Sequence, residues 1–270
     1  QVPGWGQTSW AIFTPDGGSV LIGSASGGTG AGAEWKARRW NVRDGKLVRE
    51  FTGHESGVQR IAVSPDGKRM ATHETGKTVR TWDLETGKLH REIEWPVHWQ
   101  YAGFAYSQAG ELIGVAPLNR AKDTTAMDLL AGKALATWVT EGRSSVHGLS
   151  PDTRLVATIE KHRDPRRGPD GHWTIRDRTT GTVVSRLPIE ELSYLHPVTF
   201  SHDNTKIAVT VGRREHTSIH LYDVKSGNRI RTIAGHACEV ASLAFSPDGK
   251  TLASGAWDST VLIWDLTSKP

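Results

Sequence analysis

The stretch GHACEVASLAFSPDGKTLASGAWDSTVLIWDL, residues 235–266, decides how the whole chain is interpreted. It predicts three short strands, over 240–245, 252–254 and 259–264, of which the first and last are rich in β-branched and aromatic residues. Between the first two lies Ser246-Pro-Asp-Gly249. In this turn sequence proline presets φ, aspartate bonds its own backbone, and glycine accepts the strained position. The pattern is typical of short strands joined by tight turns.

The same unit recurs five more times toward the N-terminus. The turn after its first strand begins at Thr14, Ser64, Ser107, Ser150, Ser201 and Ser246. The Trp264-Asp265 pair has counterparts, 42 to 49 residues apart, at Trp40-Asn41, Trp82-Asp83, Met127-Asp128, Arg176-Asp177 and Tyr222-Asp223. A glycine follows five residues later at Gly45, Gly87, Gly132, Gly181 and Gly227, which predicts one repeated turn with positive φ. A four-stranded blade needs a period of this length.

These motifs resemble the WD40 repeat, whose Gly-His pair, Ser-Pro-Asp-Gly turn and closing Trp-Asp pair all stand in residues 235–265. The resemblance implies an all-β fold, a β-propeller of about six four-stranded antiparallel blades. The units are expected, within a single domain, at about 1–52, 53–96, 97–139, 140–188, 189–234 and 235–270. The last unit stops after its third strand. The chain is therefore interpreted as a piece of a longer protein, or as a propeller with a weak closing blade.

The repeat units differ in length mainly in one connection between strands. The face of the molecule that carries this connection is therefore the candidate binding face. The distance from each Trp position to the next Ser turn is 23 to 25 residues, whereas the distance from the Ser turn to its own Trp position is 18 to 26. The extra residues lie between the second and third strands of units one, four and five. Insertions in repeat proteins collect on one face, often the binding face. In WD40 proteins this is the top face.

The candidate partner-binding residues are basic and aromatic side chains near these loops: Trp99, Arg163, Arg166, Arg167, Arg213, Arg214 and Trp257. Arginines bind carboxylates and phosphates in a fork geometry, and exposed aromatics serve as interface anchors. Trp257 directly precedes a turn and is expected to be exposed. The alternative is that the arginines form solvated loops and that the tryptophans cover the ends of the blade cores.

One constellation in unit six looks catalytic. His236, Ser254 and Asp258 stand near Trp264 and offer a nucleophile, a base and an acid. The resemblance implies a different role: the four residues form a buried structural tetrad, hydrogen-bonded from Trp264 through Ser254 and His236 to Asp258. The chain shows no glycine-flanked nucleophile elbow. In unit two Gly76 replaces the aspartate, and in unit four Arg176 replaces the tryptophan. A buried arginine costs stability unless it reaches solvent or a carboxylate.

The composition of the chain bears on four further questions: disorder, membrane spans, metal sites and cellular location. Hydrophobic residues make up 37% of the chain, which argues against disorder, and no apolar run is long enough for a membrane span. His162, Asp164, Asp170 and His172 fit no structural zinc spacing, and no metal or cofactor is predicted. The single Cys238 and the lack of a visible signal peptide favour a cytoplasmic location. The chain starts at Gln1, so a targeting segment could have been removed.

The leading functional prediction is a non-enzymatic scaffold that binds a protein or peptide, in particular an acidic one. The resemblance also implies a sensor or regulatory part of a larger bacterial protein. The alternative is nucleic-acid binding, because the isoelectric point is about 9.2 and arginines lie next to tryptophans. A propeller hydrolase or lyase would need acids clustered in the central channel, and the first-strand segments offer few.

Overall fold

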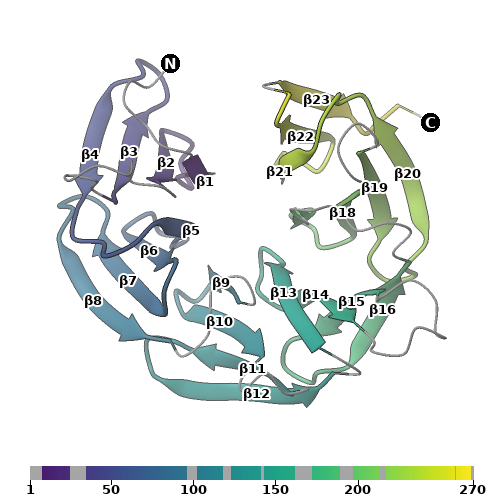
Figure 1. Ribbon diagram of the computed structural model, residues 1–270, viewed down its shortest axis with the longest axis horizontal. Helices are drawn as coiled ribbons and strands as arrows, with labels where there is room; N and C mark the ends of the chain where they lie inside the picture. Colours follow the sequence, from purple (N-terminus) through teal and green to yellow (C-terminus); the bar gives the residue numbers. More distant parts are fainter. Residues whose placement is uncertain are drawn as a thin grey trace. The chain divides into compact units, whose positions relative to one another are not determined.

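The computed structural model describes residues 8–24, 35–95, 102–117, 123–140, 143–161, 172–188, 197–212, 217–258 and 260–268. Within these ranges the regular structure is entirely β-strand, in six antiparallel sheets (Figure 1). Five sheets have four strands and the last has three. Hydrogen-bonded neighbours are consecutive in the chain, so each sheet is one blade with strands a to d. This confirms the predicted fold class, a six-bladed β-propeller with a three-stranded last blade.

The strands of blades 1 to 3 are short, as the turn spacing predicts. Blade 1 contains β1 (Thr8–Phe13), β2 (Ser19–Ser24), β3 (Ala37–Asn41) and β4 (Leu47–Phe51). Blade 2 contains β5 (Val58–Val63), β6 (Arg69–Glu74), β7 (Thr78–Asp83) and β8 (Leu89–Glu94). Blade 3 contains β9 (Gly103–Tyr106), β10 (Leu112–Pro117), β11 (Asp123–Asp128) and β12 (Lys133–Val139).

The later blades follow the same order. Blade 4 contains β13 (Arg143–Leu149), β14 (Leu155–Lys161), β15 (His172–Asp177) and β16 (Val183–Leu187). Blade 5 contains β17 (Val198–Phe200), β18 (Lys206–Val211), β19 (Ser218–Asp223) and β20 (Arg229–Ala234). Blade 6 contains β21 (Val240–Phe245), β22 (Thr251–Ala256) and β23 (Val261–Asp265).

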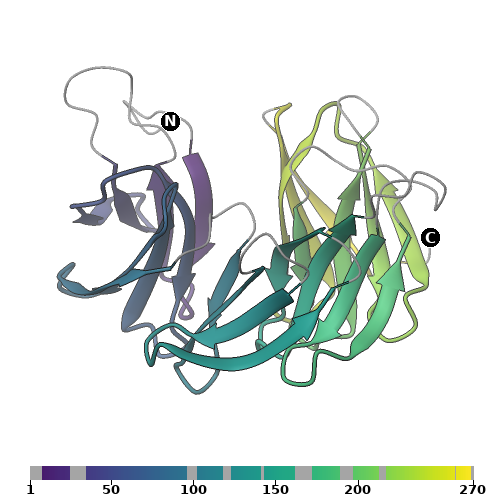
Figure 2. The same ribbon diagram turned by 60° about the horizontal axis from the view of Figure 1, so that its bottom comes forward.

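The contacts divide the chain into two compact units, each with its own cores. The first comprises residues 1–100, 104–114 and 128–133, and the second comprises 101–103, 115–127 and 134–270. In the first unit, blades 1 and 2 share a core in which Phe51 packs edge-on against Trp82. In the second unit, one buried cluster joins blades 4 and 5 and another joins blades 5 and 6. The sheets of these three blades stand side by side in Figure 2.

The turn between strands a and b has the same hydrogen bonds in five blades. In blade 2 the Ser64 hydroxyl donates to Asp66 Oδ1 at 2.6 Å, and the backbone N–H groups of Lys68 and Arg69 donate to Asp66 and Ser64. The Ser–Asp or Thr–Asp bond recurs in blades 1, 4, 5 and 6. The sequence signal Ser-Pro-Asp-Gly thus sets the direction in which strand b starts.

The predicted glycine turn between strands c and d is confirmed. Gly45, Gly87, Gly132, Gly181 and Gly227 have φ between +66° and +74°. In this left-handed region a Cβ is strained, which explains the recurrence of glycine at one offset.

The pairing of strands b and c defines equivalent positions in different blades. Trp82 pairs with Met70, Arg176 with Val156, and Trp264 with Leu252. Two residues further along strand b stand Thr72, Thr158 and Ser254, which are therefore equivalent hydroxyl positions.

Candidate functional site

In blade 6 the four residues that looked catalytic form one hydrogen-bonded chain. The indole N–H of Trp264 donates to Ser254 Oγ at 2.7 Å, and Ser254 Oγ lies 2.7 Å from His236 Nε2. The other ring nitrogen, His236 Nδ1, lies 3.0 Å from Asp258 Oδ2. Asp258 also accepts the backbone N–H of Ala237 at 2.9 Å. The chain ties the connection before strand a to strands b and c of the same blade.

The geometry leaves Ser254 unsuited to nucleophilic attack. Its side chain is buried, with 1% of its surface exposed, and its oxygen is held between the tryptophan and the histidine. His236 is buried too, whereas Trp264 and Asp258 are partly exposed. The Thr260 hydroxyl, which donates to Asp258, keeps the pKa of that carboxyl well below its usual range. A buried hydroxyl and indole N–H need partners, and this chain supplies them.

Blade 2 contains the tryptophan, hydroxyl and histidine of this chain, and a carboxylate from another position holds the loop before strand a. Thr72 Oγ1 accepts the Trp82 indole N–H at 2.9 Å and lies 3.0 Å from His54 Nε2. Gly76 provides no side chain at the aspartate position, but Glu74 of strand b provides the carboxylate instead. Its Oε2 accepts the backbone N–H groups of Glu55 and Ser56 at 2.9 and 3.0 Å.

At the level of sequence, an acid was sought only at Gly76, the position equivalent to Asp258 of blade 6. Glu74 was missed because this carboxylate lies two residues before that position. The signal that could have found it is strand periodicity, since residues two apart in a strand face the same side. Glu74 is two residues after Thr72 and therefore lies on the same face of strand b as Thr72.

Blade 4 replaces the tryptophan chain with a buried ion pair. Arg176 occupies the tryptophan position, and its Nε and Nη2 donate to Glu160 Oε1 at 3.1 and 2.8 Å. Glu160 is 0% exposed and Arg176 is 5% exposed. Glu160 lies two residues after Thr158, as Glu74 lies two residues after Thr72. The expectation that Arg176 needs solvent or a carboxylate is thus met by a carboxylate on the neighbouring strand.

Of the proposed partner-binding residues, the structure describes Trp257. Its side chain is 58% exposed, as the position before the turn predicts, and its backbone N–H donates to the Glu239 carbonyl at 2.9 Å. Trp99, Arg163, Arg166, Arg167, Arg213 and Arg214 lie outside the described residues. Two other tryptophans belong to the blade interiors, because Trp95 is 2% exposed and Trp138 is 7% exposed.

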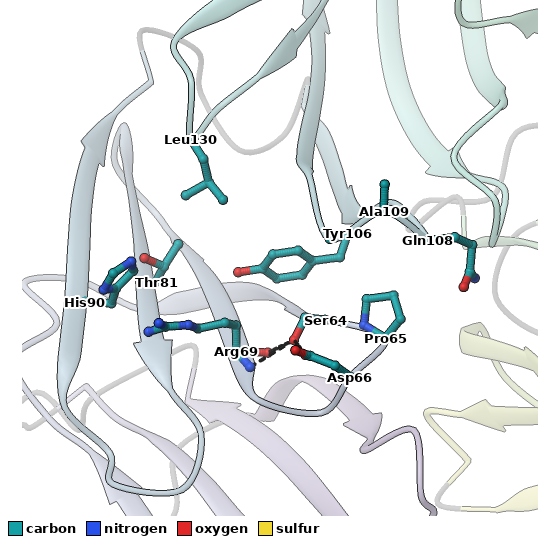
Figure 3. A pocket seen from close by; sticks show the side chains of 11 residues that line it. Ser64, Pro65, Asp66, Arg69, Thr81, His90, Tyr106, Gln108, Ala109 and Leu130 are labelled. Carbon is teal, nitrogen blue, oxygen red and sulfur yellow. Dashed lines mark hydrogen bonds between the residues drawn. The ribbon is translucent and has the colours of Figure 1, made fainter.

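A cavity that the sequence did not indicate lies in the first unit, between blades 2 and 3. It has a volume of about 320 Å3, and its lining includes Arg69, Thr81, His90, Tyr106 and Leu130 (Figure 3). No group of three or more metal-ligating side chains occurs in the described part of the chain. The described residues also contain no helix with the length and apolar character of a membrane span.

Comparisons with known proteins agree with this architecture. The family model of the WD domain, G-beta repeat, matches residues 45–83 and 227–265. The Periodic tryptophan protein 2 homolog of Schizosaccharomyces pombe is 43% identical over a match covering 23% of this chain and 7% of that protein. Ribosome biogenesis protein ERB1 of Chaetomium globosum is 25% identical over 82% of this chain and 33% of that protein.

A third relative matches over most of both chains. The Serine-threonine kinase receptor-associated protein of Bos taurus is 24% identical, over 82% of this chain and 70% of that protein. The chain spans a third or less of the length of the first two relatives. Two family-model repeats, WD-repeat relatives and six propeller blades agree: the chain carries WD40 repeats at residues 45–83 and 227–265 and is similar to WD-repeat proteins.

Proposed function

We propose that this chain is a non-enzymatic scaffold that binds a protein or peptide through the connections between strands b and c. One observation carries the proposal: Trp257, a large aromatic side chain, is 58% exposed at such a connection in blade 6. The turn that presents it is fixed by backbone and side-chain hydrogen bonds at Trp257, Asp258 and Thr260. A rigidly presented, exposed tryptophan has the properties of an interface anchor.

The proposed binding face comprises the b–c connections of blades 4, 5 and 6. In a propeller, consecutive blades repeat the same strand order, so these connections leave the same end of the strands. The basic residues Arg163, Arg166, Arg167, Arg213 and Arg214 belong to the connections of blades 4 and 5. With Trp257 they would favour an acidic protein or peptide. Trp99 is a further proposed anchor.

The relatives support a scaffold role without naming a partner for this chain. One is named for ribosome biogenesis and another for association with a kinase receptor. Because the first relatives are several times longer than this chain, a sensor or regulatory role within a larger protein is part of the proposal.

A second candidate function is binding of single-stranded nucleic acid, which is favoured by the isoelectric point of about 9.2. Phosphate contacts would make such binding strongly dependent on salt. The net charge of +4 is modest for a chain of 270 residues, and an acidic peptide is therefore the preferred ligand class.

The test compares two charge reversals. The Arg166→Glu, Arg167→Glu double variant should associate more slowly with a fluorescent acidic peptide and show a weaker salt dependence. Lys88→Glu, on an exposed c–d turn, is the matched control and should bind as the unaltered chain does. Equal binding by both variants would overturn the proposed face. Preference for a fluorescent oligothymidine over the acidic peptide would favour the nucleic-acid alternative.

A further inference from the structure

The cavity between blades 2 and 3 lies beside a strand-c position that holds a short side chain. The position directly before the tryptophan position is Arg39 in blade 1, Thr81 in blade 2, Ala126 in blade 3, Ile175 in blade 4, Leu221 in blade 5 and Ile263 in blade 6. Ile175 and Leu221 are 0% and 2% exposed in the hydrophobic clusters of their blades. Arg39 donates to Ser19 Oγ and to the Leu84 carbonyl of the next blade. The Thr81 side chain is shorter than that of Arg39 and does not reach the next blade as Arg39 does. The cavity lies beside Thr81.

Two hydrogen-bond donors face this cavity without a partner. Arg69 begins β6 and Tyr106 ends β9, and neither the Arg69 guanidinium nor the Tyr106 hydroxyl has a hydrogen bond or ion pair within the described structure. Figure 3 shows the Tyr106 ring crossing the cavity and the Arg69 guanidinium lying on the side of Thr81 and His90. Burial raises the pKa of Tyr106 to about 12, so its hydroxyl keeps the proton that it can donate.

The walls around these donors are held in place. Arg91 of β8 donates to the Leu130 carbonyl at 2.5 Å, which fixes the c–d turn of blade 3 against blade 2. Leu130 and Pro65 supply apolar surface to the lining. Asp66 also lines the cavity, but its Oδ1 accepts hydrogen bonds from Ser64 and Lys68, and Figure 3 places it away from the guanidinium.

We propose that this cavity binds a carboxylate group of a peptide, with Arg69 and Tyr106 as the two recognition residues. The Arg69 guanidinium would donate hydrogen bonds to both carboxylate oxygens, and the Tyr106 hydroxyl would donate to one of them. The aliphatic carbons that carry the carboxylate would pack on Leu130 and Pro65. A carboxylate fits better than a phosphate, because one guanidinium balances one negative charge and Asp66 would repel a second.

The carboxylate could come from a glutamate side chain or from a peptide C-terminus. Both present the same two oxygens on an aliphatic stem. The site is lined by an a–b turn and a c–d turn of the first compact unit, whereas the proposed scaffold face consists of b–c connections of the second unit. It therefore does not depend on the proposed function.

The experiment is an NMR titration of the full chain with three peptides. They are acetyl-Gly-Leu-Glu-Leu-Gly-amide, its Gln counterpart, and acetyl-Gly-Leu-Leu with a free carboxyl terminus. Chemical-shift changes at Arg69, Tyr106 and Leu130 are expected with the Glu peptide, the free-carboxyl peptide or both, and this comparison identifies the source. No such change is expected with the Gln peptide.

The variants separate recognition from folding. Arg69→Gln should weaken binding at least about tenfold, the loss expected for a charge-assisted hydrogen bond. Tyr106→Phe should weaken it less, by about threefold to tenfold. Thr81→Ile should weaken binding by narrowing the cavity beside the Arg69 guanidinium, and it should fold because blade 4 has isoleucine at the equivalent position.

Two controls should bind as the unaltered chain does. Lys206→Gln changes the blade 5 counterpart of Arg69, and Trp257→Ala changes the proposed scaffold face. Equal affinity for the Glu and Gln peptides, or unchanged affinity in Arg69→Gln, would overturn the proposal. Displacement of the carboxylate peptides by equimolar inorganic phosphate would also overturn it.

Discussion

Blades 6 and 4 place different chemistry at the same position of strand c. In blade 6 Trp264, Ser254 and His236 form a hydrogen-bonded chain that ends on the partly exposed Asp258. In blade 4 Arg176 and Glu160 form a buried ion pair across strands b and c. The comparison teaches that the fold accepts more than one pair of polar groups at this position, a tryptophan with a hydroxyl or an arginine with a carboxylate.

Blade 2 contains both solutions. The His54–Thr72–Trp82 chain stands beside Arg80, which is 2% exposed and forms ion pairs with Glu74 and Glu92. Glu74 therefore holds both a buried arginine and the backbone of the preceding loop. Blade 2 links the two solutions and shows that the strand-b carboxylate is compatible with the tryptophan chain.

The largest expected effect follows from breaking the buried pair of blade 4. Glu160→Ala leaves the Arg176 guanidinium buried without its carboxylate and should lower the free energy of unfolding by about 3–5 kcal/mol. Urea denaturation measures the loss. Glu92→Ala is the control, because Glu92 is 53% exposed and Arg80 keeps Glu74, so the loss should stay below about 1 kcal/mol. Equal losses in the two variants would remove the distinction between buried and exposed pairs.

The second prediction concerns pH and the histidine of blade 2. Burial, assisted by the charge of Arg80, lowers the pKa of His54 to about 4. An unfolded histidine has a pKa of about 6.5, so the unfolded chain binds the proton first as pH falls. The stabilising contribution of neutral His54 is full above pH 6.5 and is lost toward pH 4, by roughly 3 kcal/mol. Denaturation at several pH values should show this slope, and His54→Gln should reduce it.

A smaller effect is expected from the tetrad of blade 6. His236→Ala removes the partner of Ser254 and Asp258 and should cost about 1–3 kcal/mol of unfolding free energy. The loss should be smaller than that of Glu160→Ala, because no buried charge is left unpaired. A change in Tm of less than one degree would contradict a structural role for the tetrad.

Strand order and turn chemistry could be predicted from the sequence because each depends on local residues. The recurring Ser-Pro-Asp-Gly turn and the glycine five residues after each Trp position predicted six blades and five positive-φ turns. The carboxylates that replace the tetrad contacts in blades 2 and 4 were harder to predict from the sequence. Glu74 and Glu160 act on groups in another strand or loop, and the cavity beside Thr81 depends on packing between blades. The two glutamates share an offset of two residues after the hydroxyl position, but that offset differs from the aspartate position of blade 6, and the cavity leaves no signal in the repeat.

The central claim is that buried polar residues hold the blades, whereas exposed loop residues bind the partner. Its most direct test measures, in two variants, the unfolding free energy and the affinity for the fluorescent acidic peptide of the charge-reversal experiment, which is not the glutamate peptide of the cavity titration. His236→Ala should lower the stability by about 1–3 kcal/mol and leave the affinity unchanged under conditions in which it is folded. Trp257→Ala should leave the stability within about 0.5 kcal/mol and weaken binding by at least about fivefold. A His236→Ala protein of unaltered stability that has lost binding, or a Trp257→Ala protein that binds normally, would contradict the account.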